Sequence, residues 1–491
     1  MMADSKEKVT LTTGSVDAKS EQISQPPQNE PGSTQPPRNE SATEPAYPKW
    51  HYVAIVAAGC LIMMTTCSFV FAFGVYQSLY EEMAAQPNTP FTGASTALID
   101  LIGTLAIALM SMAGPYATAW SKQYSPQAVI IAGGWVFGVA YILASFSRAL
   151  WHFALTQGLL LGVGCCLAYV PTMSVAPTWF SARRGLAMGV IISGTGIGGM
   201  MWPPVLRAMI SHIGFRNALR LSGCIATTIV TGAGAVLRWE PRFHANLKAR
   251  QQEQLTSNPS STSSRTQWKQ LLTVPLVDRT TAFSARFLAQ ASGCFLQSAG
   301  YTTPLFFYVA FAQTLGYSTT TAATFLTVSN ASNFVSRIVL GYLADKFGRI
   351  NALATTTLVS AVAVFAFWLP ATFSPDDGVS DAAARGCFIV FTVLYGAFAS
   401  AYISLFPASL VEVFGVDKFT SVNGVLYLIR GMGALVGTPL VGLLIPERTA
   451  LVEAGAYRRA AGTVGALLMA AAAACFWVRW EMRGSNPGWR V

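Results

Sequence analysis

The chain has 491 residues, of which 52% are hydrophobic and only 11% are charged, and its formal net charge is +10. Soluble domains carry roughly 25% charged residues, so this composition excludes an ordinary soluble protein. The basic residues are scattered over short polar segments and form no concentrated patch, which argues against nucleic acid as a partner.

The first part of the chain, residues 1–47, is rich in Ser, Gln, Pro, Asn and Glu and nearly lacks large apolar residues. Such a segment buries too little apolar surface to offset the entropy cost of ordering. Gln25–Glu30 recurs there almost unchanged as Gln35–Glu40, a pattern typical of a low-complexity spacer. We expect a disordered cytosolic tail without a cleaved signal peptide.

From residue 51 onward, roughly twelve apolar stretches alternate with short polar loops. A bilayer core about 30 Å thick requires about 20 apolar residues per helix, and Val53–Tyr76 and Ala128–Phe146 approach or exceed this length without a charge. Backbone groups in lipid must be paired within their own segment, so these stretches are expected to be helices. The predicted spans are 51–76, 93–118, 127–147, 152–174, 185–209, 217–238, 281–312, 319–342, 350–370, 384–411, 419–445 and 459–480.

A long polar segment at 240–280 separates six predicted spans from six others. The fold prediction is an all-α integral membrane protein, in which twelve transmembrane helices form two pseudo-symmetric six-helix bundles. Its predicted parts are the tail 1–47, a first bundle at 48–239, a basic cytosolic linker at 240–280, a second bundle at 281–480 and a cytosolic tail at 481–491.

Basic residues in the linker set the expected orientation. Placing 240–280 in the cytoplasm puts Arg183, Arg184 and the basic end of the chain on the same side, so the positive-inside rule favours cytoplasmic termini. Several arginines on the opposite side, among them Arg216 and Arg448, argue against this orientation. The expected location is a multi-pass position in the plasma membrane.

The eight cysteines all fall within predicted spans and are interpreted as small apolar packing residues. The sequence contains no Walker loop, no HExxH motif and no spaced Cys/His set for a metal. We therefore predict no enzymatic activity, no cofactor and no metal site.

Similar residues recur where the fourth span leads into the fifth and where the tenth leads into the eleventh. The recurring residues are Pro171, Phe180, Arg183 and Gly189 in the first half, and Pro407, Phe414, Lys418 and Gly424 in the second. Two parallel repeats with a site between them are a transporter architecture.

Three segments of this chain resemble motifs of a known family. They are Tyr169–Pro171 with Trp179–Gly189, then Gly194–Gly199, and finally Gly341–Arg349. Together they resemble the major facilitator superfamily, specifically its fungal monocarboxylate porter-like branch, over about residues 50–480. The match is incomplete, because the chain lacks the acidic-glycine start of the first span and the Asp and Gly of the loop after the second.

Gating residues are predicted from the same segments. Glycines four apart let helix backbones approach closely, which suits either a gating surface or static packing. The resemblance implies that charges at Gly341–Arg349 latch one side closed through ion pairs between the halves. The predicted gating residues are Arg183, Arg184, Gly189, Gly194, Gly198, Asp345, Lys346 and Arg349.

Arg337 is a charged residue deep in the eighth span. A central arginine costs about 2.5–3.5 kcal/mol on insertion scales unless it faces water or a partner. Its guanidinium would hold a carboxylate with two parallel hydrogen bonds, although snorkelling to a helix end is the alternative. In the branch that this chain resembles, proton-coupled members carry an aspartate four residues before this arginine. This chain has Asn333 there, and its amide cannot take up a proton.

Asp100 is the carboxylate within the first-half spans and is the candidate proton-coupling residue. Desolvation would make it titrate near neutrality, whereas a neighbouring arginine would keep it an ionised structural partner. Arg430 in the eleventh span lines the cavity or pairs with an acid, and Arg286 is expected to snorkel. The resemblance implies a cavity lined by the first, fourth, seventh and tenth spans, where Tyr301, Tyr395 and Tyr402 are predicted to contact substrate.

These observations predict a secondary active transporter that works by alternating access. The expected substrate is an organic anion or monocarboxylate-like metabolite, imported or exported, with protons as a candidate coupling ion and one chain as the functional unit. The alternatives are a nutrient sensor with a transporter fold and a carrier of an uncharged apolar metabolite. A sensor usually has a long folded cytoplasmic extension, and the tails here are short.

Overall fold

The computed structural model describes residues 47–257, 277–373, 378–445 and 453–483. The chain divides into the units 1–47 and 48–491, and only the second is described below. The predicted disordered tail, the Ser/Thr run of the linker and most of the predicted C-terminal tail lie outside the described residues.

The first half contains the helices that the apolar stretches predict. They are α1 (Lys49–Phe71), α2 (Phe73–Ala84), α3 (Thr96–Met112), α4 (Gly114–Gln123), α5 (Pro126–Phe146), α6 (Leu150–Phe153), the π-helix η1 (Ala154–Leu160), α7 (Leu161–Trp179), α8 (Arg184–Ile213) and α9 (Phe215–Gly234). α1 with α2 and α3 with α4 each form one predicted span.

The second half repeats this pattern. Its elements are α12 (Arg279–Ala282), α13 (Ala285–Thr314), α14 (Thr319–Phe347), α15 (Arg349–Ala363), the π-helix η3 (Val364–Trp368), α16 (Leu369–Ala371), α17 (Asp381–Ala399), α18 (Ala401–Gly442), the 3-10 helix η5 (Ala454–Tyr457) and α19 (Arg458–Arg483). In the linker, α10 (Pro241–Ser257) is a helix that the apolar pattern did not predict.

Local sequence explains where several helices begin and end. Ser125, Ser284, Ser318 and Ser380 each accept a hydrogen bond from a backbone N–H of the first turn that follows, as N-caps do. Gly415 has a φ of 75°, outside the helical region, and breaks α18 between the predicted tenth and eleventh spans.

Seven helical segments are long and apolar enough to cross a membrane, or eight if α3 and α4, bent by 42°, form one span. One of the seven, Asp381–Gly442, covers two predicted spans. α9, α13 and α14 match predicted spans but fall outside this criterion of length and composition. A membrane helix that packs against other helices can carry more polar residues than a helix that faces lipid. The failure of α9, α13 and α14 to meet the criterion is therefore compatible with the twelve-span prediction.

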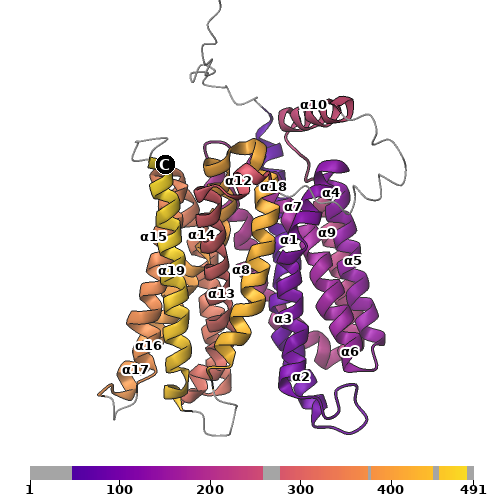
Figure 1. Ribbon diagram of the computed structural model, residues 1–491. Helices are drawn as coiled ribbons and strands as arrows, with labels where there is room; N and C mark the ends of the chain where they lie inside the picture. The colour runs from indigo at the N-terminus through magenta and orange to yellow at the C-terminus, as the bar shows by residue number, and fades with distance from the viewer. Residues whose placement is uncertain (1–46, 258–276, 374–377, 446–452, 484–491) are drawn as a thin grey trace, which may run out of the picture. The chain divides into compact units, whose positions relative to one another are not determined.

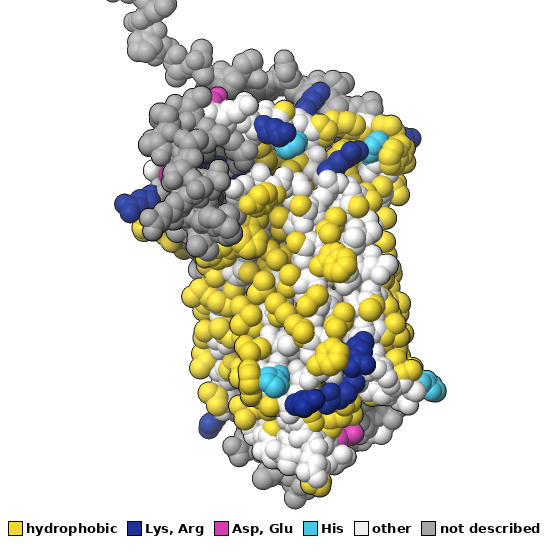
Figure 2. Space-filling model, turned by 90° about the vertical axis from the view of Figure 1, so that its right-hand side faces the viewer, with side chains coloured by type: hydrophobic (Ala, Val, Ile, Leu, Met, Phe, Trp, Pro, Cys, Tyr) yellow, Lys and Arg dark blue, Asp and Glu magenta, His cyan; other side chains and the backbone are white. Residues whose placement is uncertain are grey.

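The surface agrees with a membrane position. Figure 2 shows one side of the molecule, where hydrophobic side chains cover the middle and Lys and Arg gather near both ends. Large apolar residues are exposed on the helices, among them Trp135, Phe146 and Trp151. In Figure 1, α10 and α12 lie at one end of the helices, called here the linker end, and α2 and α6 lie at the other.

The two halves pack on each other in a reciprocal way. α8, the fifth span of the first half, packs on α14, the second span of the second half. Conversely, α3 and α4, the second span of the first half, pack on α18, whose later part is the fifth span of the second half. This exchange of equivalent helices confirms the predicted pseudo-symmetry, and Figure 1 shows the indigo-to-magenta half beside the orange-to-yellow half.

Candidate functional site

A cavity lies between the two halves and is lined from seven helices. The lining residues are Cys67, Phe71, Ile107, Met110, Ser111, Tyr169, Ile192, Thr195, Ser298, Tyr301, Thr302, Arg337, Ile403, Arg430 and Ala434. Its volume is about 40 Å³, room for only a few water molecules. A molecule larger than a few waters would require this cavity to widen.

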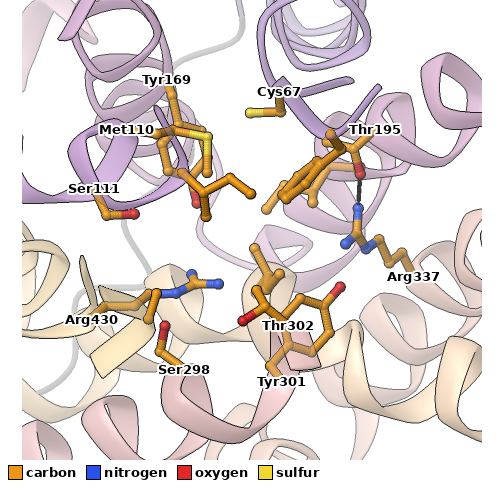
Figure 3. Close-up of a pocket in the computed structure, with 15 residues that line it drawn as sticks. Cys67, Met110, Ser111, Tyr169, Thr195, Ser298, Tyr301, Thr302, Arg337 and Arg430 are labelled. Atoms are coloured by element: carbon orange, nitrogen blue, oxygen red, sulfur yellow. Dashed lines mark hydrogen bonds between the residues drawn. The ribbon is translucent and has the colours of Figure 1, made fainter. Parts of the chain in front are cut away.

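Arg337 lies on this cavity, as its position in α14 predicts, and only 2% of its surface is exposed. Its Nη1 donates to the carbonyl oxygen of Ile192 at 2.6 Å and to the hydroxyl of Thr195, both on α8 (Figure 3). Its Nε has no hydrogen-bond partner among the described residues. In this conformation the arginine thus connects the two halves as well as facing the cavity.

Arg430 of α18 lines the same cavity and is 8% exposed. Figure 3 shows its guanidinium pointing into the cavity, across from Arg337. Its Nη1 lacks a hydrogen-bond partner within the described chain, and its Cζ lies 6.0 Å from the centre of the Tyr427 ring. From the sequence Arg430 is a weaker candidate than Arg337, although both are charges within apolar spans.

The predicted tyrosines occupy different positions. Tyr301 lines the cavity, whereas Tyr395 and Tyr402 are buried outside the lining. The hydroxyl of Tyr395 donates to the carbonyl oxygen of Tyr301 at 3.0 Å, so Tyr395 supports the residue that faces the cavity. Tyr402 stacks on Phe406, and within the described part of the chain its hydroxyl has no hydrogen-bond partner.

Asn333 and Asp100 are not among the lining residues. Asn333 is buried one turn before Arg337, and its Oδ1 lacks a hydrogen-bond partner among the residues described. Asp100 is exposed near the start of α3 and accepts a hydrogen bond from the Gln77 side chain. Its role in proton coupling stays a prediction.

Most of the predicted latch residues meet at the linker end. The carboxylate of Asp345 accepts hydrogen bonds from the backbone N–H groups of Gly185 and Leu186, both at 2.8 Å, at the N-terminus of α8. Arg349 pairs with Asp345 and with Glu412, each at 2.9 Å, and also donates to the Ser181 carbonyl oxygen at 2.9 Å. An anionic side chain at a helix N-terminus is favourable, so this network joins the second half to the first.

The other three charged candidates contribute differently. Arg184 is buried and donates from Nε to the carbonyl oxygen of Pro177, which fixes the turn into α8. Lys346 lies over the ring of Tyr342 on its own helix at 4.6 Å, and Arg183 is exposed. Glu412, which the motif did not indicate, supplies the second acid of the network.

The predicted gating glycines fall into two groups. A Cβ on Gly189 would overlap the carbonyl oxygen of Arg337, so this glycine lets α8 and α14 touch across the two halves. A Cβ on Gly194 or Gly198 would instead overlap the backbone of α1, at Cys60 and Met64, within the first half. The two interpretations left open by the sequence, gating and packing, thus apply to different glycines.

A second set of hydrogen bonds joins the halves between the cavity and the linker end. The hydroxyl of Tyr169 donates to the Tyr427 hydroxyl at 3.0 Å. The side chain of Asn423 donates to Ser174 Oγ at 3.2 Å, and Lys122 Nζ donates to Ser421 Oγ at 2.8 Å. Together with the Asp345 network, these contacts close the protein between the cavity and the linker end.

Comparison with curated proteins finds relatives over most of the chain. It is 26% identical to the MFS-type transporter pynF of Aspergillus niger, over 80% of this chain and 81% of that protein. It is 27% identical to the agnestins efflux protein AgnL12 of Paecilomyces divaricatus, over 80% and 81%. It is 26% identical to monocarboxylate transporter 13 of Rattus norvegicus, over 82% and 84%.

Solved structures share the fold. The proton:xylose symporter XylE matches with a TM-score of 0.64 at 13% identity, covering 90% of this chain and 97% of XylE. The human organic anion transporter MFSD10 matches with a TM-score of 0.57 at 15% identity, covering 88% of this chain and all of MFSD10.

The family model of the Major Facilitator Superfamily matches residues 54–383, which confirms the resemblance drawn from the sequence motifs. The fungal transporters and monocarboxylate transporter 13 among the relatives agree with the branch that those motifs indicated. The chain is therefore a multi-pass membrane protein that belongs to the major facilitator superfamily of secondary transporters, and not an enzyme.

Proposed function

We propose that this transporter carries an organic anion or a monocarboxylate-like metabolite across the membrane. Its cavity would open in turn to the cytoplasm and to the outside. The observation that carries the proposal is the charge of the lining. Two arginines, Arg337 and Arg430, face the cavity, and none of the described lining residues is acidic.

The cost of these charges supports an anionic substrate. An arginine at the middle of a membrane span costs about 2.5–3.5 kcal/mol on insertion scales unless water or a partner compensates it. Neither arginine forms an ion pair within the described part of the chain. A carboxylate bound by charge-assisted hydrogen bonds would offset this cost and place substrate between the two halves.

The rest of the lining favours a substrate with an apolar part. Phe71, Ile107, Met110, Ile192 and Ile403 present apolar side chains to the cavity. Pockets of this kind bind a mainly apolar body and fix its orientation through a few polar groups. Relatives named as efflux proteins support export of a metabolite, and one named as a monocarboxylate transporter supports transport of a monocarboxylate.

One chain is proposed to transport by itself, because both halves that line the cavity belong to the same chain. Protons are a candidate coupling ion. Since the described cavity lining contains no carboxylate, proton uptake would have to occur elsewhere, and Asp100 is the residue that the sequence singles out.

Arg337 variants test the substrate class. Arg337→Ala is expected to nearly eliminate transport of anionic metabolites, and Arg337→Lys to raise the apparent KM severalfold, since lysine keeps the charge but not the planar fork. Metabolites would be profiled inside and outside cells that express each variant. Thr195→Val is a comparison variant at the same cavity, because it removes the α8 hydroxyl that Arg337 contacts but keeps the arginine.

The outcomes separate substrate binding from contact between the halves. If Arg337→Ala and Thr195→Val fail alike, Arg337 acts mainly as a contact to α8. If neither variant alters the accumulation of any anionic metabolite that the wild type moves, the organic-anion proposal is wrong.

We also propose that the linker end faces the cytoplasm in the plasma membrane. The exposed Asn246 in α10 offers a test in a chain whose eight cysteines are replaced. Asn246→Cys should react with a membrane-impermeant maleimide only after the cells are permeabilised. Labelling in intact cells would show the opposite orientation.

A further inference from the structure

The cavity contains one more cation than a single carboxylate would neutralise. Arg337 and Arg430 come from different helices of the second half, and Figure 3 shows them on opposite sides of the cavity. The inference drawn from this pair rests on the proposed function, because it concerns what kind of organic anion the cavity accepts.

The two arginines differ in how many of their hydrogen-bond donors already have partners in the protein. Nη1 of Arg337 already donates hydrogen bonds to Ile192 and Thr195 of α8. Arg430 directs its guanidinium into the cavity, and its Nη1 lacks a partner in the described chain. In the conformation with the linker end closed, Arg430 therefore offers the freer donor to an incoming anion.

Two serine hydroxyl groups lie on the Arg430 side of the cavity. Figure 3 shows Ser298 of α13 and Ser111 of α3 on its side of the cavity. Both are buried lining residues, one from each half of the protein. A carboxylate bound to Arg430 would also accept hydrogen bonds from hydroxyl groups of both halves. Its binding would therefore favour a state in which the two halves lie close together.

The charge balance decides the substrate class. A monoanion on either arginine leaves the other buried without a counter-charge, and a neutral partner for a buried cation is unfavourable. Two acidic groups, one at each arginine, leave the loaded cavity without net charge. The apolar lining residues would then contact the body of the molecule.

We propose that Arg430, with Ser111 and Ser298, forms a second anion subsite, and that the transported metabolite carries two acidic groups, one for Arg430 and one for Arg337. The cavity thus selects dianions with an apolar body over monoanions of the same body.

Benzoate and isophthalate are suitable probes, since they share one ring and differ by one carboxylate. Binding to the purified full-length chain is measured as the concentration dependence of the shift in its unfolding temperature. Isophthalate is expected to bind at least about tenfold more tightly than benzoate, because each charge-assisted contact contributes about a factor of ten or more.

Arg430→Gln is expected to abolish the preference for isophthalate over benzoate, because both probes would then bind through Arg337 alone. Arg148→Gln, which changes an exposed arginine between α5 and α6, is the matched control and should leave both affinities unchanged. If Arg430→Gln does not fold, the relative affinity of the wild-type protein for isophthalate and benzoate still tests the proposal.

Equal affinities of the wild type for the two probes, or an undiminished isophthalate preference in Arg430→Gln, would overturn the second subsite but leave the organic-anion proposal standing. If neither probe binds the wild type, the organic-anion proposal falls as well. Binding of benzoate alone likewise excludes the dianion.

Discussion

Gly189→Leu is expected to abolish transport while membrane insertion and expression stay close to the wild-type level. Gly189 lies where α8 of the first half meets α14 of the second, and even a Cβ there would overlap the carbonyl oxygen of Arg337. Backbone cannot give way as a flexible side chain does, so the halves would be held apart. The closed linker end described here would then no longer form.

Transport and yield, measured together, separate this effect from misfolding. Gly232→Leu in α9 is the matched control, because a Cβ at Gly232 meets open space and transport should persist. Gly198→Leu is expected to lower yield instead, since Gly198 packs on α1 within one half. Wild-type transport rates in Gly189→Leu would show that the contact does not matter for the cycle.

Asp345→Asn is expected to shift the protein towards the state that is open at the linker end and to reduce transport about tenfold or more. The carboxylate of Asp345 accepts from two backbone N–H groups of α8 and from Arg349. A hydrogen bond to a charged acceptor contributes about 1.5–3 kcal/mol, so losing the charge weakens closure by at least about one such bond. A loss of about 1.4 kcal/mol already changes the equilibrium tenfold.

Alkylation of a cysteine introduced at Leu186 reports on this opening, because Leu186 lies against Gly341 of α14. In a background without native cysteines, Leu186→Cys should react faster when Asp345→Asn is present. Lys346→Gln serves as the control at the same helix end, since Lys346 contacts Tyr342 of its own helix. Unchanged alkylation and transport in Asp345→Asn would contradict the latch.

Hydrophobic length predicted most of the helices, because lipid imposes it on every span. The break between the predicted spans 384–411 and 419–445 occurs at Gly415, where a positive φ suits glycine. α10 could not be predicted in the same way, since it lies in a polar segment that contains no apolar stretch of transmembrane length.

The site was harder to predict than the spans. Arg337 and Arg430 give the same signal in the sequence, and only the packing shows that both face one cavity. Asp100 lies within a predicted span, yet it is exposed near the start of α3 and accepts a hydrogen bond from Gln77. Glu412 meets Arg349 from a distance of 63 residues, which a local motif cannot indicate.

At three glycines between α8 and α14, Gly185, Gly189 and Gly341, the nearest neighbour is main chain of the other helix. Gly185 faces Gly341, and Gly189 faces the carbonyl oxygen of Arg337. These glycine contacts do not depend on the compound that is carried, so cavity substitutions that keep the hydrogen bonds of Arg337 to α8 can change the substrate without changing how the two halves pack. Natural selection could therefore adapt this protein to a new compound through a few cavity substitutions, while drift at the glycines would be eliminated whatever the compound.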